Sequence, residues 1–180
     1  MLEILKRRLP TRADTFLALS VATLLIFSWE LRSLFYNAPA FFLSFTLGEF
    51  LSITAYMLAV GFLETLASTL FAVVLAVLLP GIVLRDGFAD KASFLFIAAA
   101  AVSINLQFNM SNQPDVAFLV GQLVFLLLLW LGSVILVHFV APLRKITLDI
   151  FDRLTVFTYI YLPLGALSLL VVMFRLLVTR

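Results

Sequence analysis

The sequence contains no cysteine, a single histidine and few charged residues. The absence of cysteine excludes disulfides, thiolate metal ligands and cysteine nucleophiles. Because His138 is the only histidine, a bis-histidine haem or a multi-histidine metal site within one chain is excluded as well. The sequence also lacks a Gly-rich phosphate loop and the motifs of zinc proteases and serine hydrolases. We therefore expect no metal ion, no cofactor and no enzymatic activity.

Charged residues make up only 12% of the chain and hydrophobic residues 64%, with a mean hydropathy of +1.18. Soluble domains carry about 25% charged and roughly 45–50% apolar residues. The apolar stretches are continuous, whereas the strands of membrane barrels alternate apolar and polar residues. The composition therefore predicts an all-α integral membrane protein, with residues 1–180 forming one transmembrane helical domain. The net charge is only +2, and no nucleic-acid partner is expected.

Five apolar runs are separated by short polar or charged segments. A helix needs about 20 residues to cross a bilayer, and each run approaches or exceeds that length. The expected spans cover about 15–36, 50–84, 92–108, 116–141 and 156–178. Two further segments, near 40–48 and 142–153, are expected to form short interfacial helices. The first is rich in phenylalanine but too short to cross, and the second has apolar residues at helical spacing.

The second run leaves two threadings open, because residues 40–84 can cross once, or twice with a hairpin near Gly61. Cytoplasmic loops are rich in lysine and arginine, which discriminates between the two. Two crossings divide the 12 basic residues evenly between the two sides. One crossing leaves only Arg32, Arg175 and Arg180 on the outer side. We therefore predict a five-span bundle with the N-terminus inside and the C-terminus outside. The hairpin stays an alternative, because one helix from Phe50 to Leu84 would be about 50 Å long.

Glu64 lies inside the second run, and an ionisable residue within a membrane segment is by default a functional candidate. Along an unbroken helix, Glu64 is about 30 Å from Arg85, which predicts a position near the outer boundary of the hydrocarbon. The same estimate of distance along each helix predicts that other polar residues lie at a similar depth in the bilayer. Among them, Arg175 is the expected ion-pair partner of Glu64. The full set of ligand-binding or ion-pair candidates is Glu64, Arg175, Glu30, Arg32, Asn105, Gln107 and Gln122.

His138 lies near the predicted inner end of the fourth span, at a different depth from Glu64. A lone histidine in this position is expected to be a hydrogen-bonded structural residue or an interface residue. The alternative is that it acts as the single axial ligand of a pigment.

Three classes of function fit this pattern. The first is a non-catalytic membrane subunit or scaffold of a larger complex. In it, the seven candidate residues near the outer boundary, which we call the outer polar belt, hold the helices together. The alternative is a small permease, or the membrane substrate-binding component of a transporter, with the belt lining an outward-facing polar pocket. An enzyme of lipid or cell-envelope metabolism ranks last. The expected partners are membrane lipids and other membrane subunits or a second copy, and the expected location is the cell (plasma) membrane as a multi-pass protein.

Overall fold

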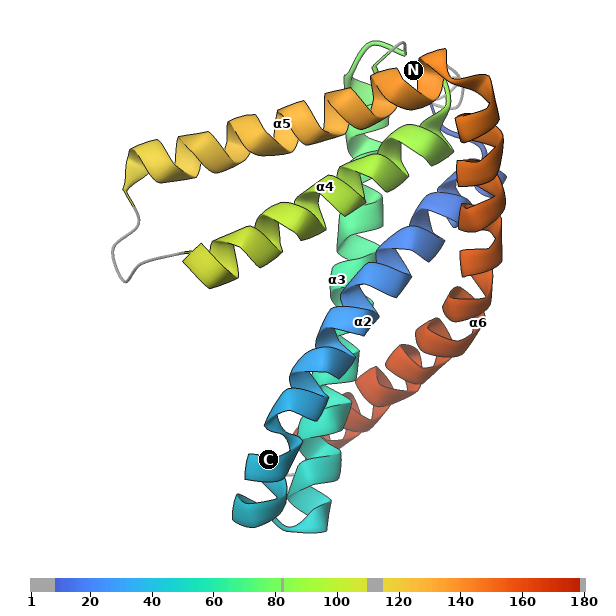
Figure 1. Ribbon diagram of the computed structural model, residues 1–180. Coiled ribbons are helices and arrows are strands. Elements are labelled where there is room, and N and C mark those ends of the chain that lie inside the picture. Colours follow the sequence, from blue (N-terminus) through green and yellow to red (C-terminus); the bar gives the residue numbers. More distant parts are fainter. Residues whose placement is uncertain (1–8, 82, 110–114, 179–180) are drawn as a thin grey trace.

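The computed structural model describes residues 9–81, 83–109 and 115–178, with the side chains of all of these except 141–143. Within these ranges the chain forms five long helices (Figure 1). Each of the five is long and apolar enough to cross a membrane. The described residues are helical without strands, which confirms the predicted all-α class, and the five candidate helices agree with the predicted number of spans. The helices are α2 (Arg12–Ser44), α3 (Leu47–Leu78), α4 (Phe88–Asn109), α5 (Val116–Phe139) and α6 (Ala141–Val178).

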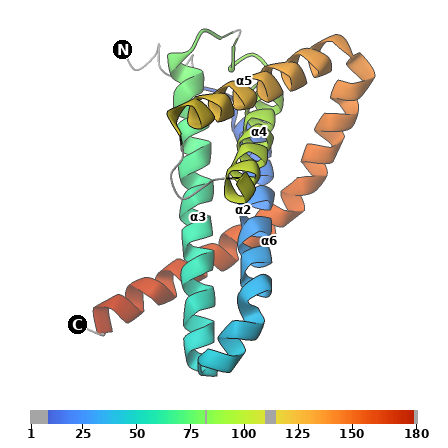
Figure 2. The ribbon, with the colours of Figure 1, turned by 60° about the vertical axis from the view of Figure 1, so that its left-hand side comes forward.

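The helices divide into a stem and an arm. Helices α2, α3 and α6 pack on one another and form the stem, which runs from top to bottom of Figure 1. Helices α4 and α5 form the arm, an antiparallel hairpin that joins the stem mainly through α4 on α2. Figure 2 shows the arm crossing the upper half of the stem at a steep angle. Helix α2 begins at one end of the stem and α6 ends at the other.

The turn between α2 and α3 is very short because the sequence caps the second helix strongly. The Thr46 hydroxyl accepts a hydrogen bond from the Glu49 N–H at 3.4 Å, and the Glu49 carboxylate accepts one from the Thr46 N–H at 2.8 Å. This reciprocal capping box satisfies donors that a helix start otherwise leaves open. Only Phe45 and Thr46 therefore lie between the two helices.

Neither predicted interfacial helix exists as a separate element. Residues 40–48 belong to the end of α2, the turn and the start of α3, because α2 continues through Pro39 to Ser44. Residues 142–153 form the first third of α6, which runs without interruption to Val178. No proline or glycine lies between residues 142–153 and the span expected to begin at residue 156, so the sequence has no signal that ends the helix at this point.

Helix α3 is continuous through Gly61, in agreement with a single crossing. It ends at Leu78, six residues before the predicted boundary. Leu79 has an extended backbone (φ −80°, ψ 157°), as expected of a residue that precedes a proline. A turn follows, and it includes Gly87 with φ +79°, a left-handed conformation that favours glycine.

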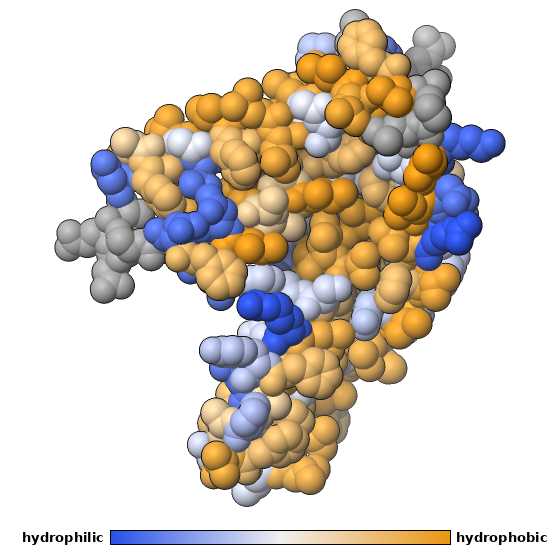
Figure 3. All heavy atoms as spheres, viewed as in Figure 1, coloured by the Kyte–Doolittle hydropathy of each residue, from blue (hydrophilic) through white to orange (hydrophobic). Residues whose placement is uncertain are grey.

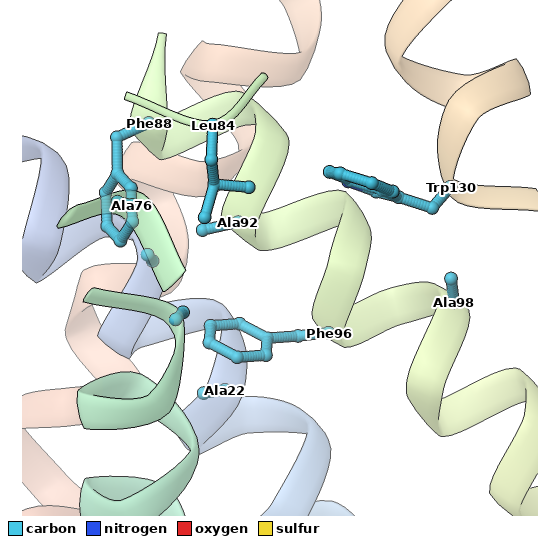
Figure 4. Close-up of a cluster of buried hydrophobic side chains, with 10 residues drawn as sticks. Ala22, Ala76, Leu84, Phe88, Ala92, Phe96, Ala98 and Trp130 are labelled. Carbon is cyan, nitrogen blue, oxygen red and sulfur yellow. The ribbon is translucent and has the colours of Figure 1, made fainter. Parts of the chain in front are cut away.

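Small side chains on the helices of the stem allow the arm to pack closely. Figure 4 shows the ring of Phe96 pointing from α4 toward Ala22 of α2. In a membrane, helix association relies on such close van der Waals packing. The core cluster consists of Ala18, Ala22, Ala72, Ala76, Leu84, Phe88, Ala92, Phe96, Ala98 and Trp130.

Gly165 lies at a close contact between α6 and α3. A β-carbon at this position would lie 2.6 Å from the Phe62 Cβ and 3.2 Å from the Leu58 carbonyl oxygen. Nearby, the rings of Phe27 and Tyr161 stack with their centroids 5.1 Å apart and join α2 to α6. The three helices of the stem therefore pack here without room for a methyl group at Gly165.

Candidate functional site

A cavity of about 750 Å³ lies between α2, α3 and α4. Figure 3 shows a hollow where the arm leaves the stem, with hydrophilic residues gathered along its lower edge. The walls are mostly apolar and include Leu25, Ile26 and Phe96, together with several alanines. The polar lining consists of Ser28, Trp29, Arg32, Glu64, Ser68 and Ser103.

Two of the predicted polar residues, Arg32 and Glu64, line this cavity, and a third, Glu30, lies beside it without being part of the lining. Helices α2 and α3 are antiparallel, so their midpoints lie side by side, and Glu30 of α2 packs over Gly61 of α3. A β-carbon on Gly61 would lie 3.2 Å from the Glu30 Cγ. The half-buried carboxylate of Glu30 is close enough to that of Glu64 for the two charges to interact. Glu64 itself is exposed toward the cavity, and it has no hydrogen bond or ion pair with any other residue that the structure describes.

Arg32 lies on the α2 side of the same cavity. Its guanidinium carbon is 5.0 Å from the centroid of the Trp29 ring, one helical turn away. A guanidinium over an aromatic face is attracted by the negative potential of the ring. Trp29 therefore holds the positive charge of Arg32 at the cavity wall, and within the described part of the chain no carboxylate forms an ion pair with Arg32.

Two other predicted residues meet at the free end of the arm. The Asn105 amide of α4 donates a hydrogen bond to the Gln122 side-chain oxygen of α5 at 2.9 Å. Asn109 in turn donates to the Asn105 side chain at 2.6 Å. Gln107 is exposed on the same helix end. The single predicted belt is thus two separate groups, one at the cavity and one that joins the helices of the arm.

The expected pair between Glu64 and Arg175 has no support among the described contacts. Arg175 lies in the last turn of α6, and its charge acts on the carboxylate of Glu49 at the start of α3. Along α3, Glu49 is about 22 Å from Glu64 at 1.5 Å per residue. The pairing of Arg175 with Glu64 stays a prediction.

His138 occupies the last turn of α5 and is exposed. Its ring lies edge-on to Phe139, with the centroids 5.5 Å apart. Its predicted roles, as a structural or interface residue or as the ligand of a pigment, stay predictions. Within the described residues, no three histidine, aspartate or glutamate side chains form a group able to hold a metal ion.

The early end of α3 changes the expected depth of Glu64. The distance of about 30 Å assumed an unbroken helix as far as Arg85. Because α3 ends at Leu78, Glu64 is about 21 Å from that end of the helix and about 25 Å from the other. Glu64 therefore lies close to the middle of α3 and not near one of its ends.

Sequence reasoning offered a polar pocket only as an alternative and did not predict its position between α2, α3 and α4 or the contact of Arg32 with Trp29. The cavity arises from the angle between the arm and the stem, which no local pattern encodes. Two spacings in the sequence do, however, place polar or aromatic residues of the cavity on one helix face. Glu64 and Ser68 are four residues apart and share one face of α3, and Trp29 and Arg32 are three residues apart on α2.

The chain matches no known protein-family model, no curated protein and no solved structure.

Proposed function

We propose that the protein is a non-catalytic membrane subunit that binds an amphiphilic molecule in the cavity between α2, α3 and α4. In this role it is the membrane substrate-binding component of a larger assembly. The observation that carries the proposal is Glu64, a carboxylate in the middle of an apolar helix, facing a cavity, without a partner among the described residues.

The length of α3 supports a position of Glu64 within the hydrocarbon. A helix of 32 residues is about 48 Å long, and the hydrocarbon core is about 30 Å thick. A layer of this thickness that lies within the length of α3 always contains the part of the helix between roughly 18 and 30 Å from its N-terminal end. Glu64 is about 25 Å from that end. The same argument applies to Glu30 in α2, which has 33 residues. Carboxylates at this depth are costly and mark binding or transport pathways.

The lining of the cavity favours an amphiphile. Most of the wall is apolar and suits a hydrocarbon chain, while Arg32, Glu64 and three serines supply polar groups that suit a polar headgroup. Ligand sites commonly combine apolar walls with a few convergent polar groups. Helices α3 and α4 both pack on α2 and touch each other little, which favours an opening of the cavity between them. We expect a ligand to enter through this opening from the bilayer.

A cavity-filling variant tests the proposal. Ala67 lines the cavity but is exposed, so Ala67→Phe fills space with little cost to folding. Ala117→Phe, at an exposed position of α5 outside the cavity, makes the same change elsewhere. We expect native mass spectrometry of the protein in mild detergent to find a retained amphiphile in the wild type and in Ala117→Phe, and a loss in Ala67→Phe. Equal retention in all three, or none in the wild type, would contradict the proposal.

The proposal takes the membrane to be the cell (plasma) membrane, with the N-terminus inside and the C-terminus outside. The charge distribution of the sequence supports this orientation. Membrane fractionation checks the location, and a threading experiment described below checks the orientation.

A second candidate function is that of a scaffold that packs against other membrane subunits or a second copy. It is favoured by α5, of which only Trp130 and Val137 are buried. Gly121 and Gly132 share one face of α5, and a β-carbon on either would meet no atom within 4 Å. Such small residues let another helix approach closely. A stoichiometric protein partner, lost in Gly132→Leu but retained in Ala67→Phe, would favour the scaffold; a monomer with a bound amphiphile would favour the binding component.

A further inference from the structure

We infer that the cavity selects an amphiphile whose headgroup carries a primary ammonium next to a phosphate, as in a phosphoethanolamine lipid. This inference rests on the proposed function and names the chemical class of its ligand. It assigns Glu64 as the partner of the ammonium and Arg32 as the partner of the phosphate.

The charged lining of the cavity favours a zwitterionic headgroup. Glu64 brings one carboxylate and Arg32 one guanidinium to the wall, and neither forms an ion pair with another described residue. Glu30, which packs over Gly61, adds a carboxylate near Glu64 but does not line the cavity. An ammonium beside Glu64 gives that carboxylate a partner, which is needed where water is scarce. A purely anionic headgroup would pair with Arg32 and leave Glu64 without a partner.

The type of ammonium follows from hydrogen bonding. An ionised carboxylate is an acceptor only, so Glu64 pairs best with a group that has N–H donors. A primary ammonium has three donors and a quaternary ammonium has none. The site therefore discriminates between the two headgroups in favour of the primary ammonium.

Arg32 and the serine hydroxyls fit the phosphate. Arginine presents planar N–H donors that match phosphate oxygens, and such charge-assisted hydrogen bonds are strong. Ser28 lies one helical turn before Arg32 on α2, and its hydroxyl also lines the cavity. Since Arg32 and Glu64 come from different helices of the same cavity, one zwitterionic headgroup can bridge them. The apolar wall formed by Leu25, Ile26 and Phe96 then contacts the start of an acyl chain.

A titration by native mass spectrometry tests this selectivity. The delipidated protein is titrated separately with phosphatidylethanolamine, phosphatidylcholine and phosphatidylglycerol that carry the same acyl chains. We expect the ethanolamine lipid to bind about tenfold more tightly than the other two, which corresponds to one charge-assisted hydrogen bond. Glu64→Gln should remove this difference. Asp152→Asn, which makes the same change of charge at an exposed residue of α6, should retain it.

The outcomes separate this inference from the proposed function. Equal binding of all three lipids by the wild type, with loss in Ala67→Phe, would overturn the selectivity but leave an amphiphile-binding cavity. Preference for the glycerol lipid would overturn the assigned roles of Glu64 and Arg32. Binding that Ala67→Phe does not reduce would overturn both the inference and the proposed function. Folding of each variant is checked by its thermal unfolding before titration.

Discussion

The guanidinium of Arg144 donates a hydrogen bond from its Nε to the Asp90 Oδ2 at 3.1 Å. The pair joins the first turn of α6 to the first turn of α4, although 54 residues separate them in the sequence. The Asp90 side chain is largely buried, whereas that of Arg144 is more than half exposed. Within the described part of the chain, the second oxygen of Asp90 is buried without a hydrogen bond.

Removing the arginine of this pair should destabilise the protein. In Arg144→Gln the buried carboxylate loses its charged partner, and we expect a loss of about 2 kcal/mol in the free energy of unfolding. The double variant with Asp90→Asn should recover part of the loss, because no buried charge remains. Thermal unfolding in mild detergent measures both. Arg153→Gln is the matched control: its pair with Asp149 at 3.2 Å is exposed, and such pairs contribute about 0–1 kcal/mol. Equal effects of the two arginine variants would contradict the role of Asp90.

A methyl group at Gly165 should disrupt the contact between α3 and α6. Its β-carbon would lie 2.6 Å from the Phe62 Cβ and 3.1 Å from the Phe27 Cζ, so Gly165→Ala forces the helices apart. We expect a loss of about 2 kcal/mol, typical of overpacking, in the same unfolding experiment. Gly121→Ala, where the new methyl meets no atom within 4 Å, should leave stability unchanged or raise it slightly. A Gly165→Ala protein as stable as Gly121→Ala would show that the two helices do not approach this closely.

Neutralising Glu64 should raise the stability of the ligand-free protein. An unpaired carboxylate in an apolar surrounding is unfavourable, and Glu64→Gln removes its charge and its repulsion with Glu30. We expect the melting temperature of delipidated protein to rise or stay the same, and the stabilisation by added phosphatidylethanolamine to fall. A marked loss of stability without lipid would instead indicate a structural ion pair, such as the one predicted with Arg175.

Reporters placed after Gly87 and after Val178 should lie on opposite sides of the membrane. The first follows α3 and the second follows α6, so three crossings separate them if α4, α5 and α6 each span. The charge distribution predicts the Gly87 reporter inside and the other outside. At each position, one fusion to a reporter that is active only in the cytoplasm and a second fusion to one that is active only outside measure the side of the membrane. Two reporters on the same side would contradict the five-span threading.

Much of the fold follows from local patterns in the sequence. Apolar runs of sufficient length fixed the number of helices, and Pro80 and Gly87 lie in the turn after α3 as their conformational preferences require. Helix ends were less predictable. Residues 142–153 are amphipathic and suggested a separate interfacial helix, but helix formation needs an explicit stop signal to end, and none occurs before the apolar part of α6.

The candidate site was only partly predictable. Distance along the helices predicted that Glu30, Arg32 and Glu64 lie at one level, and the antiparallel pairing of α2 and α3 does bring Arg32 and Glu64 to one cavity, with Glu30 beside Gly61. The predicted distance from Arg85 ran through residues 79–84, which lie outside α3, and the depth of Glu64 in the membrane stays a prediction. The pairing of Glu64 with Arg175 also stays a prediction, since residues at one level can lie on different sides of a bundle. The direction in which the arm leaves the stem, which creates the cavity, depends on packing between distant residues.

The two-residue turn at Phe45 and Thr46 leaves little chain at this end of the molecule that a protease or an antibody could bind. A protease needs an extended stretch of several residues, and between α2 and α3 the capping box of Thr46 and Glu49 leaves none. Digestion of intact membranes from that side should therefore leave α2 and α3 joined in a single fragment. Several large exposed side chains around the turn are apolar, among them Phe42, Leu43 and Leu47, and we therefore expect antibodies raised against soluble loops not to bind there.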